Sequence, residues 1–181
     1  PIFANLVLAD EINRATPKTQ SALLEAMAEG TVTAAGKSRP LPSPFLVLAT
    51  QNPLEMEGTY PLPEAQIDRF LVHINVGYPT IEQEVAMLST HQAEAQVTHP
   101  VVDAEQVRTM QKLVRDVHIE EDLLEYAARL SDFTRHETTV LLGASPRATL
   151  ALIQASKAAA ALDGRAYVTP DDVRSMAGPV L

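Results

Sequence analysis

Cysteine is absent from the 181 residues of this chain, and so is tryptophan. Without cysteine the chain can form no disulfide, no thiol nucleophile and no cysteine-based zinc site. Basic residues are also scarce: 14 lysines and arginines stand against 23 aspartates and glutamates, for a formal net charge of -9. This balance argues against nucleic acid as a partner, because nucleic-acid-binding surfaces need clustered positive charge.

Two further absences concern location and nucleotide chemistry. No apolar run is long enough to span a membrane and no signal-peptide pattern is visible, so we expect a cytoplasmic protein without membrane insertion. No phosphate-binding loop of the form Gly-x-x-x-x-Gly-Lys followed by Ser or Thr occurs. Gly36-Lys37-Ser38 lacks the upstream glycine, and its neighbours favour a hairpin turn.

The most informative segment is Asn5–Glu11, in which the apolar run Leu6–Ala9 ends in two adjacent carboxylates, Asp10 and Glu11. The run is typical of a short strand buried on both faces of a parallel sheet. Such a strand delivers its carboxyl end to the crevice where α/β proteins bind ligands. Successive strand residues point to opposite sides, so the two carboxylates are expected to have different roles. An acidic helix start is the structural alternative.

Three later segments add to this motif. They are Phe45–Thr50, which runs into Gln51-Asn52-Pro53; Phe70–Asn75, which follows Pro61–Arg69; and Gly143–Ala148, which opens a helix with Arg147 in its first turn. We expect the first two to be strands of the same sheet. Because the carboxyl ends of parallel strands meet at one edge, Asn52 is expected near the carboxylate pair.

In this order the four elements resemble the Walker B, sensor 1, arginine-finger and sensor 2 motifs of AAA+ ATPases. The amino-acid sequence is similar to that of the MoxR family in Asp10–Ala15, Ala49–Pro53 and Leu62–Phe70. The resemblance covers nearly the whole chain. It implies an α/β protein: a partial AAA+ P-loop-type core with parallel strands in residues 1–77, followed by an all-α lid domain in residues 78–181. It also implies the C-terminal portion of a longer ATPase, from Walker B onward, with the Walker A loop not represented.

The resemblance assigns roles to the residues of the sheet edge, with ATP and Mg²⁺ as cofactors. Asp10 would bind Mg²⁺, largely through water, and Glu11 would polarise the lytic water. Asn52 would contact the γ-phosphate or position that water, because an amide both donates and accepts hydrogen bonds. An Asx-type turn before Pro53 is the alternative for Asn52.

Two arginines complete the implied site. Arg69 resembles an arginine finger that acts on the nucleotide of a neighbouring subunit; an ion pair with Asp68 or Glu64 is the alternative. Arg147 resembles sensor 2 and would bind phosphate near a helix N-terminus, with a structural salt bridge as its alternative. The implied catalytic set is thus Glu11, Asn52 and Arg69, and the implied nucleotide-binding set is Asp10, Glu11, Asn52 and Arg147.

Four other residues are less specific. Asn13 and Arg14 follow the carboxylate pair closely enough to face a subunit boundary, although Asn13 could equally restrain Glu11 by a hydrogen bond. Lys37 and Arg39 on the hairpin could touch a client or a pore, but ordinary solvated charges explain them as well.

Helix signals are local and clear. Thr16 is a plausible N-cap, Pro17 suits the first helical position, and Gly30 ends that helix. Beyond Pro79 we expect five helices: Ile81–His91, Asp103–Val117, Glu120–His136, Pro146–Leu162 and Pro170–Met176, with Asp103 and Thr169 as N-caps.

The sheet presents a physical difficulty. The family order places the phosphate-loop strand between the strand that ends at Asn52 and the strand Phe70–Asn75. Without that strand, Phe70–Asn75 would lack a neighbour on its inner side, and each unpaired buried backbone group costs about 1–3 kcal/mol. We therefore expect that residues 1–77 cannot form a normal AAA+ core alone, whereas the helical region could fold independently.

For the intact protein, the resemblance implies a ring oligomer, usually a hexamer, that couples Mg-ATP hydrolysis to chaperone-like remodelling or maturation of partner complexes. Such proteins often work with von Willebrand factor A domain proteins. The present chain alone, without a phosphate loop, is expected to be inactive. Two alternatives remain open: a magnesium-chelatase-like ATPase subunit, which a longer hairpin insertion would support, and a non-catalytic interaction module.

Overall fold

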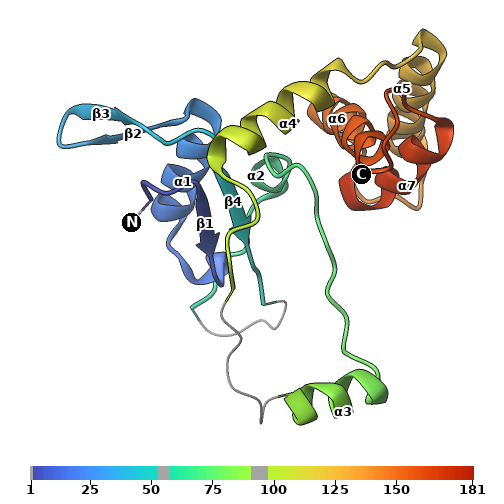
Figure 1. The fold of residues 1–181 in the computed structure, drawn as a ribbon. Coiled ribbons are helices and arrows are strands. Elements are labelled where there is room, and N and C mark those ends of the chain that lie inside the picture. The colour runs from blue at the N-terminus through green and yellow to red at the C-terminus, as the bar shows by residue number, and fades with distance from the viewer. Residues whose placement is uncertain (1, 53–57, 91–97) are drawn as a thin grey trace.

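The structure is a computed structural model, which describes residues 2–52, 58–90 and 98–181. Strands occur in the first third of these residues, and helices make up most of the remainder (Figure 1). The elements are β1 (Leu6–Ala9), η1 (Ile12–Arg14), α1 (Pro17–Glu29), β2 (Thr31–Ala34), β3 (Lys37–Pro40), β4 (Leu46–Ala49), α2 (Glu64–Ile67), α3 (Ile81–Thr90), α4 (Ala104–Asp116), α5 (Glu121–His136), α6 (Pro146–Leu162) and α7 (Pro170–Val180).

The predicted parallel strands are present, and their register places the site. β1 and β4 have the same sequence, Leu-Val-Leu-Ala, and they pair residue by residue, from Leu6 with Leu46 to Ala9 with Ala49. One position further along, Asp10 therefore lies beside Thr50. The repeated tetrapeptide brings the carboxylate pair to the end of the second strand.

Burial of this sheet differs from the prediction. Val47 is buried, but Leu6 and Leu8 in β1 are 58% and 64% exposed. In β4, Leu46 and Leu48 alternate with Val47 and are exposed as well. The prediction that the first strand is buried on both faces is thus wrong for this chain. Alternate side chains of a strand point to opposite faces, so one face of the sheet is covered and its leucine face is open.

The predicted strand Phe70–Asn75 is also wrong. Its residues form no ladder with any described strand, and the chain runs irregularly through residues 70–80 with Ile74 and Tyr78 exposed. The physical reason is the one raised by the family order: among the described residues, no further strand lies beside β4 to receive the backbone groups of Phe70–Asn75. In that part of the chain, the parallel sheet consists of β1 and β4.

The segment between the two strands follows its local signals. Thr16 caps α1 by accepting a hydrogen bond from the Thr19 backbone N–H, and the helix ends at Gly30 with a φ of 62°. β2 and β3 then form an antiparallel hairpin. Ala35 and Gly36 at its turn have φ values of 52° and 73°, as a type I′ turn requires. The Gly-Lys pair therefore belongs to a hairpin, as predicted.

The helical region matches the predicted elements closely. Asp103 caps α4 in a capping box with Gln106, and Thr169 caps α7 in the same way with Asp172. α7 runs to Val180, four residues beyond its predicted end, and His91 at the predicted end of α3 lies outside the described residues. No helix in the described ranges is both long and apolar enough to cross a membrane.

Helices α5, α6 and α7 enclose the main hydrophobic core and lie together in Figure 1. Its buried members are Val117, Ala127, Leu152, Ala160, Val168 and Val173. Ser131 and Ser156 are fully buried beside them, and each hydroxyl donates to the carbonyl four residues earlier in its helix. Small side chains allow the helices to approach closely, and the internal hydrogen bonds satisfy the buried hydroxyls.

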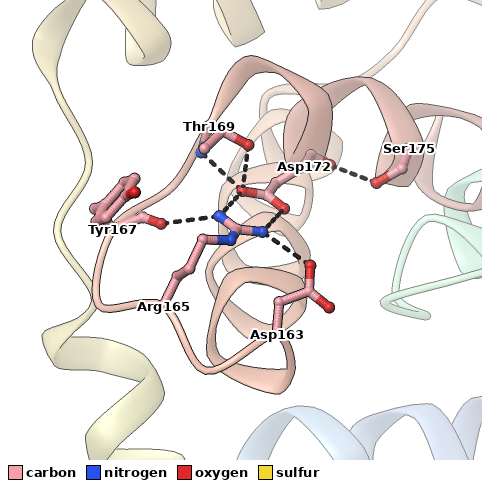
Figure 2. A network of polar contacts seen from close by, with 6 residues as sticks. All are labelled: Asp163, Arg165, Tyr167, Thr169, Asp172 and Ser175. Carbon is pink, nitrogen blue, oxygen red and sulfur yellow. Dashed lines mark hydrogen bonds and ion pairs between the residues drawn. The ribbon is translucent and has the colours of Figure 1, made fainter.

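A polar network secures the start of α7 (Figure 2). The guanidinium of Arg165 forms two hydrogen bonds of 2.7 Å to the carboxylate of Asp172, which also accepts from the backbone N–H of Thr169. Asp163 forms a further ion pair with Arg165. Hydrogen bonds from Arg165 hold the pKa of Asp172 well below its ordinary value, although burial acts in the opposite direction. The network joins the α6–α7 connection to the first turn of α7.

Candidate functional site

The carboxylate pair lies at the end of β1, where Thr50 contacts both of its residues. The Thr50 hydroxyl donates to Asp10 Oδ1 and accepts from the Glu11 backbone N–H at 2.9 Å. The Thr50 carbonyl accepts from the backbone N–H of Ile12 at 3.0 Å. Thr50, which directly follows β4, thus forms hydrogen bonds with Asp10, Glu11 and Ile12 in the turn after β1.

Glu11 occupies an unusual backbone conformation. Its φ of 48° and ψ of 51° lie in the left-handed region, which costs about 1–2 kcal/mol for a residue with a Cβ. The bonds from Thr50 stabilise this turn. The Glu11 carboxylate lies 2.9 Å from Arg14 Nε, whereas Asp10 contacts Thr50. The two carboxylates therefore have different partners, and their predicted roles stay a prediction.

Asn13 organises the approach to Asn52. It is buried, and its side-chain Nδ2 donates to the Asn52 backbone carbonyl at 3.0 Å. The structure thus favours a link to Asn52 over the predicted alternative in which Asn13 restrains Glu11. Asn13 Oδ1 is buried without a hydrogen-bond partner in the described part of the chain. Pro53, on which the Asx-turn alternative depends, lies outside the described residues.

Gln20 supports the same corner from α1. Its side chain is 1% exposed and donates to the Ile12 carbonyl at 3.1 Å and to the Tyr60 carbonyl at 2.8 Å. Tyr60 in turn donates its backbone N–H to the carbonyl of Asn13. Helix α1, the turn after β1 and the chain beyond residue 58 are therefore tied into one unit around Asn52.

Asp68, the residue before Arg69 in the chain, lies near the other predicted arginine, Arg147. Asp68, which ends α2, accepts a hydrogen bond from the Ser145 hydroxyl, and Arg147 Nη1 lies 3.8 Å from its Oδ2. Arg69 is exposed, and in residues 2–52, 58–90 and 98–181 its guanidinium forms no ion pair. The alternative pairing of Arg69 with Asp68 or Glu64 is thus absent, whereas the salt-bridge alternative for Arg147 is present.

The loop before α6 is firmly attached to α5. Thr134 Oγ1 accepts from the Ala144 backbone N–H at 2.8 Å, and Arg135 Nε donates to the Ala144 carbonyl at 2.8 Å. A Cβ built on Gly143 would lie 2.6 Å from Arg135 Cα, so only glycine fits at this contact. Ser145 then caps α6 by accepting from the backbone N–H of residue 148.

The structure therefore groups the predicted residues into two clusters. Asp10, Glu11 and Asn52 lie at the end of the β1–β4 sheet, whereas Arg147 lies beside Asp68, the residue that precedes Arg69 in the chain. The prediction that Arg147 shares a nucleotide with Asp10 and Asn52 stays a prediction.

The sequence analysis gave no role in the site to Thr50 or Ser145, and it named Asp68 only as a possible partner of Arg69. Thr50 was detectable from the repeated Leu-Val-Leu-Ala, which aligns it with Asp10. Ser145 carries the N-cap signal of a serine before a proline. Asp68 gave no local signal for its partners, because it contacts Ser145 across 77 positions of the chain.

Comparison with known protein families agrees with the two parts of the fold. Residues 1–72 match the model described as the ATPase family associated with various cellular activities (AAA), and residues 132–181 match the AAA lid domain. The first match contains β1, β4 and the carboxylate pair, and the second contains the end of α5 and all of α6 and α7. Both the partial α/β core and the helical lid are thereby confirmed.

Individual relatives extend over the whole chain. The uncharacterised protein YeaC of Bacillus subtilis (strain 168) is 48% identical over 179 residues, which are 98% of this chain and 56% of YeaC. Chaperone MoxR1 of Mycobacterium tuberculosis is 43% identical over 190 residues, which cover 100% of this chain and 50% of MoxR1. The crystal structure of a candidate ATPase from Cytophaga hutchinsonii matches with a TM-score of 0.92 and 40% identity, over 100% of this chain and 58% of that one.

The chain thus spans about half the length of the curated relatives it matches. The motifs around Asp10, Asn52, Arg69 and Arg147 occur in the order that the resemblance to MoxR requires. With AAA family models on residues 1–72 and 132–181, and with MoxR relatives that align along the whole of this chain, the chain belongs to the MoxR family of AAA+ ATPases.

Proposed function

We propose that this chain supplies the Walker B, sensor and arginine-finger parts of a MoxR-type AAA+ ATPase that couples Mg-ATP hydrolysis to the remodelling or maturation of partner complexes. Residues 1–77 would form part of its core and residues 78–181 its lid. The observation that carries the proposal is the Thr50-anchored turn, which holds Asp10 and Glu11 at the carboxyl end of a parallel sheet beside Asn52.

The residues at this sheet edge fit a magnesium ion held with a nucleotide. Asp10 is exposed, and Thr50 donates to only one of its two carboxylate oxygens. The described residues contain no group of three His, Cys, Asp or Glu side chains that could hold a metal by themselves. Mg²⁺ commonly takes one or two carboxylates and completes its shell with water and phosphate oxygens, so Asp10 would hold the ion largely through water. The ion would neutralise charge on the phosphates.

Glu11 and Asn52 are proposed to act on the attacking water. Glu11 would polarise the water, and Asn52 would position it or contact the γ-phosphate. In this structure the Glu11 carboxylate contacts Arg14, and both side chains are partly exposed. A solvent-exposed ion pair is weak, so Glu11 can leave Arg14 at little cost when a nucleotide is present.

Arg69 is proposed to act on the nucleotide of a neighbouring subunit, and Arg147 is proposed to bind phosphate from the start of α6. Arg69 is exposed and the side chain of Arg147 is 58% exposed, so both can reach a phosphate. Arginine stabilises charge on a transferred phosphoryl group, and the finger acts in trans in this class of enzyme. The assembly would be a ring, with a hexamer as its proposed size. Von Willebrand factor A domain proteins are proposed partners, and the cytoplasm is the proposed compartment.

The hairpin favours this assignment over a magnesium-chelatase-like subunit. β2 and β3 are joined by two residues, without the longer insertion that would support the chelatase alternative. A non-catalytic interaction module stays the alternative of a different class, because these 181 residues contain no phosphate-binding loop.

Calorimetric titration with Mg-ATP distinguishes the ATPase from the interaction module. The titration compares this 181-residue chain with the same chain extended by the coding sequence that precedes Pro1. We expect binding and turnover in the extended chain and neither in the shorter one. Glu11→Gln in the extended chain should keep ATP binding and lower kcat by at least 100-fold, whereas Glu25→Gln, an exposed change on α1, should lower neither. Absence of binding by both chains would favour the interaction module.

A further inference from the structure

We propose that Asp68 is a positioning residue that ties the end of α2, next to Arg69, to the start of α6, which carries Arg147, so that the arginine finger follows the lid. The inference rests on the proposed function, in which both arginines serve a phosphate. It concerns a residue to which the four motifs give no role in the site.

The contacts of Asp68 join the two parts of the fold. Its backbone N–H donates to the Glu64 carbonyl at 2.9 Å, which fixes it at the end of α2. Its side chain accepts from the Ser145 hydroxyl at the start of α6 and faces Arg147 in the same helix. The carboxylate therefore connects a core helix to a lid helix 77 positions away.

The lid side of this connection is rigid. The Ser145 hydroxyl donates to Asp68 and accepts from the backbone N–H of residue 148, so the same group serves the link and the helix cap. The preceding residue, Ala144, is bonded through both its N–H and its carbonyl to the last turns of α5. Asp68 thus binds a loop whose position is set by the lid itself.

Charge explains why Arg69 stays available. An adjacent carboxylate would ordinarily attract an exposed guanidinium, because the two groups can meet at little cost. Here one Asp68 oxygen accepts from the Ser145 hydroxyl, and Arg147 lies 3.8 Å from the other. Arg69 is left exposed without an ion pair in the described residues, as an arginine that must bind an external phosphate should be.

The two contacts of Asp68 differ in strength. Arg147 lies 3.8 Å from the carboxylate with 58% of its side chain exposed, which makes this contact weak and exchangeable. The Ser145 hydrogen bond is short and partly buried. Arg147 can therefore turn to a phosphate while the Ser145 bond keeps α2 attached to α6, and Arg69 follows the lid.

The first test measures the link in the 181-residue chain, without any ATPase assay. Because the chain contains no cysteine, Glu64→Cys and Leu150→Cys place one spin label on α2 and one on α6. We expect a narrow distance distribution that broadens in Asp68→Ala and narrows again in Asp68→Asn, whose amide oxygen can still accept from Ser145. Asp163→Ala, which removes an ion pair at the other end of α6, is the control and should leave the distribution narrow. A narrow distribution in Asp68→Ala would overturn the inference.

The second test uses the extended, ATP-hydrolysing chain. Asp68→Ala should lower kcat at least tenfold with the KM for ATP changed less than twofold, and Asp163→Ala should change neither. Mixing Asp68→Ala subunits with Glu11→Gln subunits should restore turnover. The Glu11→Gln subunit supplies a positioned Arg69, and the Asp68→Ala subunit supplies an intact Glu11. An unfolded Asp68→Ala subunit could not restore turnover in this way. Lack of restoration would overturn the positioning role. Absence of turnover in the unaltered chain would instead overturn the proposed function, and the spin-label result would still decide the link.

Discussion

The helical region and the strand region of this chain contain similar apolar residues but bury them to different extents. Leu152 and Val173, between helices α5, α6 and α7, are fully buried. Leu8 and Leu46, in the β1–β4 sheet, are more than half exposed. The facing sides of α5, α6 and α7 bury a shared core, although Leu150 and Leu162 of α6 stay exposed, whereas the sheet has one open face.

The difference shows that an apolar pattern specifies a surface to be covered but not what covers it. A helix satisfies its backbone internally and needs only a neighbour for its apolar face, and α5–α7 are close in sequence. A central strand needs a strand on each side and a layer on each face. In the described residues the chain gives β1 and β4 only each other as ladder partners.

Separating the two regions would test this comparison most strongly. We expect residues 98–181 alone to be helical and to unfold cooperatively, because the hydrophobic core and the Arg165 network lie within them. Residues 2–79 alone should show no cooperative transition, since their sheet has a single pair of strands. Circular dichroism with thermal unfolding measures both. Cooperative unfolding of residues 2–79 would show that the open sheet is sufficient by itself.

Two leucine substitutions, one in each region, measure how much leucine burial contributes to the free energy of unfolding. Leu152→Ala should lower the free energy of unfolding by about 3 kcal/mol, because it removes a fully buried side chain and leaves a cavity. Leu8→Ala should change it by less than about 0.5 kcal/mol in this chain, since Leu8 is 64% exposed. Urea denaturation followed by circular dichroism compares the two. In the extended chain, a large cost for Leu8→Ala would show that the added segment covers the leucine face.

Most of what the sequence predicted correctly depends on neighbouring residues. The helix starts were recognisable because Asp103 and Thr169 precede polar partners three positions on, as capping boxes require. The hairpin was recognisable from the glycine at position 36. The parallel strands followed from their apolar runs, since both runs end in the polar residues of the site.

The features that the sequence did not predict depend on distant parts of the chain. Phe70–Asn75 has the composition of a strand, but a strand forms only where a neighbour accepts its backbone groups. The pairing of Asp68 with Ser145 joins residues 77 positions apart, and the Glu11–Arg14 ion pair depends on the left-handed turn that Thr50 holds. Local patterns contain no information on such contacts.

Gly143 tests whether the tight packing of the helical region extends to the loop that carries the lid arginine. Gly143→Ala should destabilise the chain by about 2 kcal/mol, because the new Cβ would lie 2.6 Å from Arg135 Cα in the backbone of α5. Gly178→Ala, in α7, is the matched control: a Cβ there meets nothing within 4 Å, and alanine favours helix. Chemical denaturation of both variants measures the difference. If the two substitutions changed the free energy of unfolding equally, the loop around Gly143 would be able to shift and would not be closely packed against α5.

The smallest expected effect concerns the polar anchor of the helical region and its dependence on pH. Asp172→Asn should cost about 1.5 kcal/mol at pH 7, since it weakens charged hydrogen bonds to Arg165 and Thr169. The pKa of Asp172 is held below its ordinary value of 3.8 in the folded chain. A lowered pKa stabilises the fold above that ordinary value, and the stabilisation is lost as the pH falls below it. We therefore expect the difference in unfolding free energy between the unaltered chain and Asp172→Asn to be the same at pH 7 and pH 5 and smaller at pH 3. Urea denaturation at the three pH values measures it. If the difference in unfolding free energy between the two proteins stayed constant down to pH 3, the effect of Asp172→Asn would come from packing around the side chain and not from its charge.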